Sequence, residues 1–106
     1  MTKKPWGHER ILSKTDHYVV KEIFVKAGHR LSEQFHREKT ETMFLVSGSA
    51  VLQIANKWNN MRNLVPVFIP PLTIHRLEAV GDCLIVEVSS TELDDVVRTS
   101  DDYDRD

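Results

Sequence analysis

The sequence predicts an all-β protein, built as a sandwich or barrel, and three observations lead to this fold class. The segments 18–26 and 83–89 are rich in β-branched and aromatic residues, which favour strands over helices. Glycine, proline and asparagine turn signals recur about every 8 to 12 residues, the spacing of short strands. No apolar period of 3.6 residues persists for three turns, so no long helix is expected.

We expect seven or eight short strands. In chain order they cover residues 9–12, 18–26, 30–36, 41–46, 50–55, 64–69, 74–80 and 83–89. Pro66 lies inside one of these segments and is typical of an edge strand or of a strand entrance. Residues 56–63 contain Asn59-Asn60 and predict a polar loop. Residues 91–97 predict either one helical turn or a last extended segment.

The 106 residues predict a single domain, with a lead-in at residues 1–17 and an acidic tail at residues 92–106. The tail holds seven of the 16 acidic residues but only two of the 14 basic ones. We expect it to be solvated. The remaining body is then mildly positive, which permits it to bind an anion.

Composition excludes several classes of protein. A net charge of -2 argues against nucleic-acid binding, which usually needs a strongly basic face. No apolar run approaches the roughly 20 residues of a membrane span, and no apolar stretch follows Met1, so we expect a cytoplasmic protein. The single cysteine, Cys83, lies in an apolar run and predicts a buried structural thiol. Open sheet edges and a small core favour a homodimer.

Four polar residues are spaced as metal ligands. Gln34 and His36 are two apart, so they share one face of a strand. Glu41 is five residues beyond His36, so a turn across residues 37–40 is needed to bring it to the same side. His75 follows a proline turn and can close the set. Two imidazole nitrogens and two oxygen donors suit a borderline divalent metal, with zinc first and manganese, iron, cobalt or nickel as alternatives.

This spacing resembles the two-part signature of the cupins, which are double-stranded β-helix (jelly-roll) proteins that hold a metal inside the barrel. Gln34 stands where most cupins have histidine, and this narrows the resemblance to the phosphomannose isomerases. Along nearly its whole length the chain is similar to the C-terminal isomerase domain of the type II, GDP-mannose pyrophosphorylase-linked enzymes. The matching segments include Pro5-Trp6-Gly7, Val25-Lys26-Ala27-Gly28, Leu45-Val46-Ser47-Gly48, His75-Arg76-Leu77-Glu78 and Asp94-Asp95-Val96-Val97-Arg98.

The resemblance implies a metal-dependent aldose–ketose isomerase acting on a sugar phosphate, in the first place mannose 6-phosphate to fructose 6-phosphate. Two positions depart from the family pattern, because Leu72 replaces a glycine in the turn before His75 and Ala79 replaces an asparagine. The nucleotidyltransferase domain that precedes the isomerase domain in those enzymes has no counterpart in these residues. The fold and the metal site are therefore expected more firmly than the substrate.

Isomerisation also needs a base that moves a proton between neighbouring carbons. Glu87 is the first candidate: it serves as base if its strand face looks into the cavity, and is a solvated residue if that face looks outward. Lys21 either enters the cavity, as base or anion partner, or reaches solvent. Arg98 lies in the segment that resembles the family's Asp-Ile-Val-Arg and is expected to hold a substrate phosphate bidentately.

Two other functions compete with the isomerase. His36, Glu41 and His75 alone form the two-histidine, one-carboxylate set of non-haem iron oxygenases, although Gln34 would then occupy a position needed for oxygen and substrate. A non-catalytic sugar-binding cupin is the other alternative, and Leu72 is a feature in its favour. Metal analysis with oxygen uptake, and an isomerase assay with and without chelator, separate the three.

Overall fold

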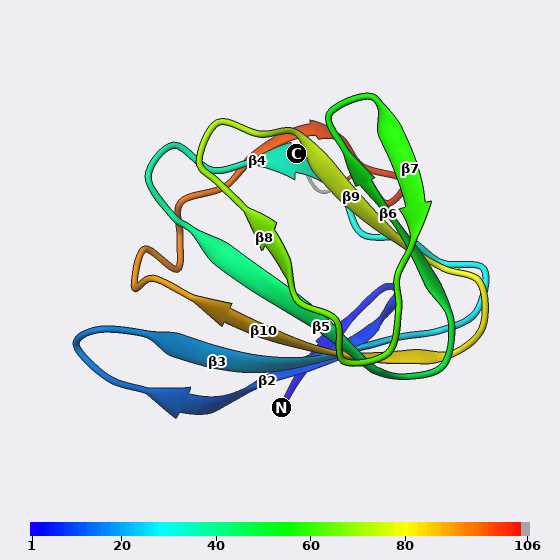
Figure 1. Cartoon of the computed structure of the whole chain (residues 1–106), viewed down its shortest axis with the longest axis horizontal. Helices are drawn as coiled ribbons and strands as arrows, with labels where there is room; N and C mark the ends of the chain where they lie inside the picture. The colour runs from blue at the N-terminus through cyan, green and yellow to red at the C-terminus, as the bar shows by residue number, and fades with distance from the viewer. Residues whose placement is uncertain (105–106) are drawn as a thin grey trace.

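The computed structural model describes residues 1–104, which fold into two antiparallel sheets that face each other (Figure 1). The six-stranded sheet has the order β1 (Thr2–Lys4), β2 (Gly7–Lys14), β3 (Val19–Val25), β10 (Cys83–Ser89), β5 (Glu41–Ser47) and β8 (Val67–Ile69). The five-stranded sheet has the order β11 (Val97–Ser100), β4 (Glu33–Phe35), β9 (His75–Ala79), β6 (Ala50–Ile54) and β7 (Lys57–Asn60). Within residues 1–104, no helix has the length and apolar character that crossing a membrane requires.

The core lies between the two sheets and follows the alternation of side chains along each strand. On β3 and β5 the buried residues alternate with more exposed ones, and they include Ile23, Met43 and Leu45. Leu52 on β6 and Leu77 on β9 pack against them from the other sheet. Burial of such apolar faces is the main stabilising term in a sandwich of this kind. The all-β prediction is therefore confirmed.

Several strand boundaries differ from the prediction. The expected polar loop at residues 56–63 contains β7, which pairs with β6 around a tight turn at Ala55, a residue with φ of 54°. All four residues of β7 are exposed, so polar residues such as Asn59 and Asn60 satisfy an edge strand without an apolar face. The strand expected at 30–36 is shorter, and β8 begins just after Pro66 at the edge of its sheet, as that proline predicted.

The acidic tail pairs with the barrel through β11, whereas Asp94, Asp102 and Asp104 remain exposed, so the expected solvated tail describes part of the described residues. Residues 91–96 form an irregular loop without a helical turn, and β11 then pairs with β4. Asp102 accepts hydrogen bonds from Arg30 at 2.6 and 3.1 Å and from the buried Arg76 at 2.8 Å. One carboxylate of the tail therefore pairs with two guanidinium groups of the barrel. Residues 105–106 lie outside the described residues.

Candidate metal centre

Three of the four predicted ligands converge at one end of the barrel. His36 follows β4, Glu41 opens β5 after the predicted turn, and His75 opens β9. All three side chains are buried, and their ligand atoms lie within 4.8 Å of one another. Glu41 Oε1 is 3.1 Å from His36 Nε2 and 2.8 Å from His75 Nε2.

The second nitrogen of each imidazole faces a backbone carbonyl. His36 Nδ1 lies 2.5 Å from the Asp95 oxygen, and His75 Nδ1 lies 2.9 Å from the Thr73 oxygen. A carbonyl can only accept, so Nδ1 must carry the proton and donate it. In the neutral ring, Nε2 then presents a lone pair toward the carboxylate of Glu41. Protein metal sites commonly fix their histidine ligands through such a carbonyl.

This arrangement fits a cation. Two lone pairs and a carboxylate oxygen that point at one another repel, and a cation among them turns the repulsion into coordination. His75 Nε2 and Glu41 Oε2 are buried and have no hydrogen-bond partner among the described residues. The residues present therefore fit a divalent metal.

Gln34 lies beside this group. It is directly opposite His75 in the pairing of β4 with β9, so the two side chains leave the sheet as close neighbours. Its amide oxygen accepts a hydrogen bond from the Ser32 hydroxyl at 2.8 Å, and that oxygen keeps a second lone pair. Gln34 as a fourth ligand stays a prediction.

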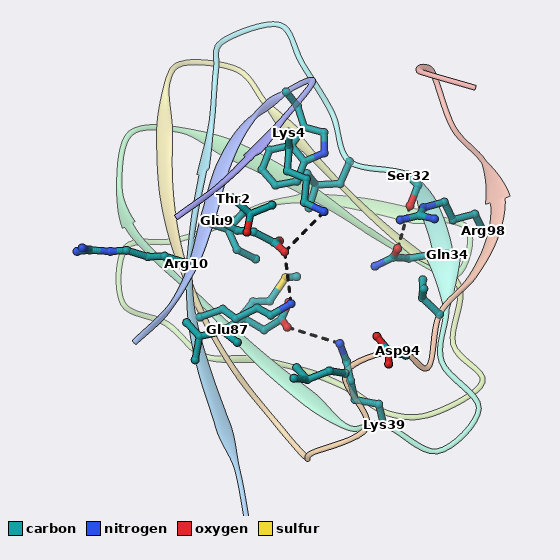
Figure 2. Close-up of a pocket in the computed structure, with 18 residues that line it drawn as sticks. Thr2, Lys4, Glu9, Arg10, Ser32, Gln34, Lys39, Glu87, Asp94 and Arg98 are labelled. Atoms are coloured by element: carbon teal, nitrogen blue, oxygen red, sulfur yellow. Dashed lines mark hydrogen bonds and ion pairs between the residues drawn. The ribbon is translucent and has the colours of Figure 1, made fainter. Parts of the chain in front are cut away.

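A cavity of about 400 Å³ adjoins the candidate centre and is lined by both sheets. Figure 2 shows Glu9, Glu87, Lys39 and Gln34 pointing into it, whereas Arg10 points away. His36, Glu41 and His75 are not among the residues that line this cavity. They lie behind Lys39, whose ammonium lines the cavity and is 3.6 Å from Glu41 Oε2. The metal-binding group and the cavity therefore share a wall.

The three residues predicted to carry catalysis all line this cavity. The alternation along β10 buries Cys83, Ile85, Glu87 and Ser89, so the mixed face of that strand looks inward. Lys21 is on the inner face of β3, opposite Glu87 in register. Arg98 lies on β11, opposite Gln34. Burial, and then the charge of Glu41, raise the pKa of Glu87 to about 8 although Lys39 opposes the shift.

Sequence reasoning missed Lys39, which is the buried cation of the site. Its ammonium lies between Glu41 at 3.6 Å and Glu87 at 3.7 Å, and only 5% of the residue is exposed. No role was predicted for Lys39, which lies in the turn across residues 37–40. A signal was available, because Lys39 and Glu41 are two apart and share a face where the chain becomes extended. Because the pKa of Glu87 is raised, Glu41 is the carboxylate that balances the Lys39 ammonium near neutral pH.

Leu72 adopts the backbone conformation of the glycine that the family pattern expects at its position. Its φ is 60°, in the left-handed region that costs an ordinary residue about 1–2 kcal/mol. The turn keeps its shape because the Leu72 N–H donates to the His36 carbonyl at 2.6 Å. The loop before His75 is thereby tied to the other histidine ligand.

The fold and the site together define a cupin, that is, a double-stranded β-helix with a candidate metal centre at one end. Two solved structures share this fold. A protein with a double-stranded β-helix domain from Klebsiella pneumoniae matches with a TM-score of 0.79 at 15% identity, over 92% of this chain and 88% of that one. A cupin 2 domain-containing protein from Halorhodospira halophila matches with a TM-score of 0.80 at 18% identity, over 88% and 70%.

Within the cupins the chain belongs to the family described as mannose-6-phosphate isomerase C-terminal, which matches residues 1–101. A mannose-1-phosphate guanylyltransferase from Escherichia coli K12 is 36% identical over 107 aligned positions, which cover 96% of this chain. The chain spans 22% of the length of that relative. The resemblance expected from the motifs is confirmed, and the domain is of the kind found at the C-terminus of mannose-phosphate-metabolising enzymes.

Proposed function

We propose that this domain is a metal-dependent aldose–ketose isomerase that acts on a sugar phosphate, with mannose 6-phosphate and fructose 6-phosphate as the first pair to test. One observation carries the proposal: the group His36, Glu41 and His75 shares a wall with a cavity into which the buried carboxyl of Glu87 projects. The membership of the mannose-6-phosphate isomerase C-terminal family supports the choice of substrate.

Each part of the cavity has a chemical task in this proposal. A divalent metal, held by His36, Glu41, His75 and Gln34, would supply a Lewis acid for the sugar carbonyl. Glu87 takes the proton from one of the two neighbouring carbons and returns it to the other, because it is the carboxyl that projects into the cavity beside the ligands. The Lys39 ammonium, 3.7 Å from Glu87, favours the ionised form of Glu87 that can accept this proton.

The remaining basic residues suit the anionic end of the substrate. Lys4 and Lys21 both lie near Glu9 Oε1, at 3.8 and 3.6 Å, so two ammonium groups share one carboxylate. Arg98 projects from the opposite wall. This excess of positive charge favours a phosphorylated sugar over a neutral one.

The test is conversion of mannose 6-phosphate to fructose 6-phosphate by the purified chain, before and after treatment with a chelator and after metal is restored. We expect activity that the chelator abolishes and the metal restores. Binding of the sugar phosphate without turnover would support the non-catalytic sugar-binding role instead. Equal rates with and without metal would exclude a metal-dependent isomerase.

One observation favours an iron oxygenase as the second candidate. The amide oxygen of Gln34 accepts a hydrogen bond from Ser32, and if Gln34 stays on Ser32, then His36, Glu41 and His75 alone would hold the metal, as the two-histidine, one-carboxylate set of such enzymes does. Anaerobic loading with iron(II), followed by oxygen-uptake measurements with candidate substrates, tests this role. No oxygen consumption by the iron-loaded protein would count against it.

A further inference from the structure

The turn that carries two of the metal ligands is held in shape by a side chain from the far end of the chain. The carboxylate of Asp95 accepts hydrogen bonds from the backbone N–H groups of Arg37 at 2.9 Å, Glu38 at 2.7 Å and Lys39 at 2.9 Å. These three bonds lower the pKa of Asp95 to about 2. One carboxylate therefore satisfies three successive donors of the turn between His36 and Glu41.

The fourth donor of the turn is satisfied from the same segment. The Thr40 N–H donates to the Ser90 hydroxyl at 3.0 Å, and the Ser90 N–H donates to the Thr40 carbonyl at 3.0 Å. The backbone carbonyl of Asp95 also faces His36 Nδ1 at 2.5 Å. Asp95 thus contacts the turn with its side chain and a metal-ligand candidate with its backbone.

The segment around Asp95 is also a wall of the cavity. It starts after β10, leads into β11, and places on that wall Leu93, Asp94, Val96 and Arg98. Residues 91–96 have no strand or helix of their own, so their position depends on contacts such as those of Asp95. The contacts that shape the metal turn therefore also fix the wall on which the substrate would lie.

We propose that Asp95 is a positioning residue that pre-forms the metal-binding turn, so that metal binding and docking of residues 90–98 are thermodynamically coupled. The inference rests on the metal site of the proposed function, but not on isomerase activity. A metal held by His36 and Glu41 needs the turn in one shape, and Asp95 supports that shape from outside. By reciprocity, the bound metal stabilises the docked segment as much as the docked segment stabilises the metal.

The first test is a titration of the purified chain with cobalt(II), followed by its visible absorption bands. Asp95→Asn, which cannot satisfy three donors with one acceptor oxygen, should weaken cobalt binding by about 10- to 100-fold. Asp104→Asn is the matched control, because it removes the same charge from the same end of the chain, at an exposed position that lines neither the cavity nor the turn; its affinity should equal that of the wild type. If the role of Asp95 is purely structural, Asp95→Asn should have a lower melting temperature than the wild type, but added metal should raise the melting temperature of both proteins by the same amount.

The second test needs no variant. In the wild-type chain, zinc should slow amide hydrogen exchange at residues 37–39 and 90–98 by about 5- to 150-fold, the usual range of coupling between linked sites. Equal cobalt affinity in the Asp95 variant and the wild type would overturn the inference and leave the proposed function intact. Equal rates of amide hydrogen exchange in residues 90–98 with and without zinc would also overturn it. If the wild-type chain binds no divalent metal, both the inference about Asp95 and the proposed function are wrong.

Discussion

Two hollows in the part of the barrel that the structure describes differ in chemistry more than in size. The cavity beside the candidate metal centre measures about 400 Å³ and the other about 570 Å³. The lining of the smaller one includes eight charged residues among those described, of which Arg10 points its side chain away (Figure 2), whereas the larger one has Arg62 as its charged residue. The larger hollow lies between β6, β7 and the segment before β8, and its lining is Leu52, Ile54, Asn59, Asn60, Met61, Arg62, Val65 and Val67.

The difference shows that volume does not mark the functional site in this fold. Charged groups are costly to remove from water, so a cluster of partly buried charges needs a reason that packing alone does not supply. Lys39 and Glu87 are both buried beside the metal-ligand candidates. The larger hollow has no comparable pair in the part of the chain that the structure describes. The expected effects below separate the two hollows, from the largest effect to the smallest.

Loss of a ligand should abolish metal binding. Glu41→Gln and His75→Gln each remove one of the converging donors. Loss of a residue that only supports a ligand lowers metal affinity by about 10- to 100-fold, and we expect these two variants to lose more than that. Metal content after dialysis against zinc measures it. Arg62→Ala in the larger hollow should bind zinc as the wild type does. Equal zinc in all four proteins would show that the site is not where the ligands converge.

Replacing Glu87 should stop turnover without removing the metal. Glu87→Gln keeps the size of the side chain but cannot accept the proton, so we expect kcat to fall by about 10²- to 10⁴-fold. Zinc content should remain that of the wild type. Glu22→Gln is the control, because Glu22 is on the neighbouring strand and pairs with Arg10 at 3.0 Å. An unchanged kcat in Glu87→Gln would place the base elsewhere.

The basic residues should act on substrate affinity. Lys21→Met and Arg98→Met each remove one charged donor from the cavity, which corresponds to about 1.5–3 kcal/mol, or roughly 10- to 150-fold in KM. Steady-state kinetics with mannose 6-phosphate measure the change. Arg10→Met is the control, since its side chain points away from the cavity (Figure 2). The same loss with unphosphorylated mannose would contradict a phosphate contact.

The tail contact should affect stability but not metal binding, because Asp102 lines neither hollow. Hydrogen bonds from Arg30, with the charges of both arginines, hold the pKa of Asp102 below its ordinary value. Since this carboxylate is partly exposed, Asp102→Asn should lower the free energy of unfolding by about 1–2 kcal/mol at pH 7.

The pH dependence of this loss follows from the lowered pKa. The stabilisation is fully present above the ordinary aspartate pKa of 3.8 and is lost as the pH falls through the lower folded value. Urea unfolding of wild type and Asp102→Asn should therefore converge at acid pH. A difference that persists unchanged at pH 2 would argue against the ion pairs as its cause.

The smallest expected effect is at Leu72. Glycine accepts a φ of 60° without cost, although it also makes the unfolded chain more flexible, so Leu72→Gly should raise the free energy of unfolding by at most about 1 kcal/mol. Leu72 is 69% exposed, so little apolar burial is lost. Metal affinity should be unchanged. A large loss of stability would mean that the side chain contributes more than the backbone conformation costs.

Part of the fold and site followed from local pattern. The alternation on the segments that became β3 and β10 fixed which residues share a face, and the spacing of His36 and Glu41 predicted the turn between them correctly. The alternation along a strand does not tell which of its two faces points into the barrel. Glu87 was for that reason equally compatible with cavity and solvent.

The misses have a common physical cause. Asp95 contacts residues that lie 56 to 58 positions earlier in the chain, and Asp102 contacts Arg30 across 72 positions. Such contacts leave no local period in the sequence. An acidic segment that is fully solvated and one that contacts the barrel can have the same composition. Composition therefore did not predict that β11 pairs with β4 or that Asp102 contacts Arg30.

By itself, the sequence determined the all-β class and the family, and it supplied the candidate metal donors, because strand alternation, turn chemistry and the spacing of donor residues depend on short segments. Tertiary structure alone decided that β10 turns Glu87 inward, that Lys39 is buried between two carboxylates, and that residues 90–98 close over the metal turn. Those outcomes depend on how two sheets meet, and that is a property of the whole chain.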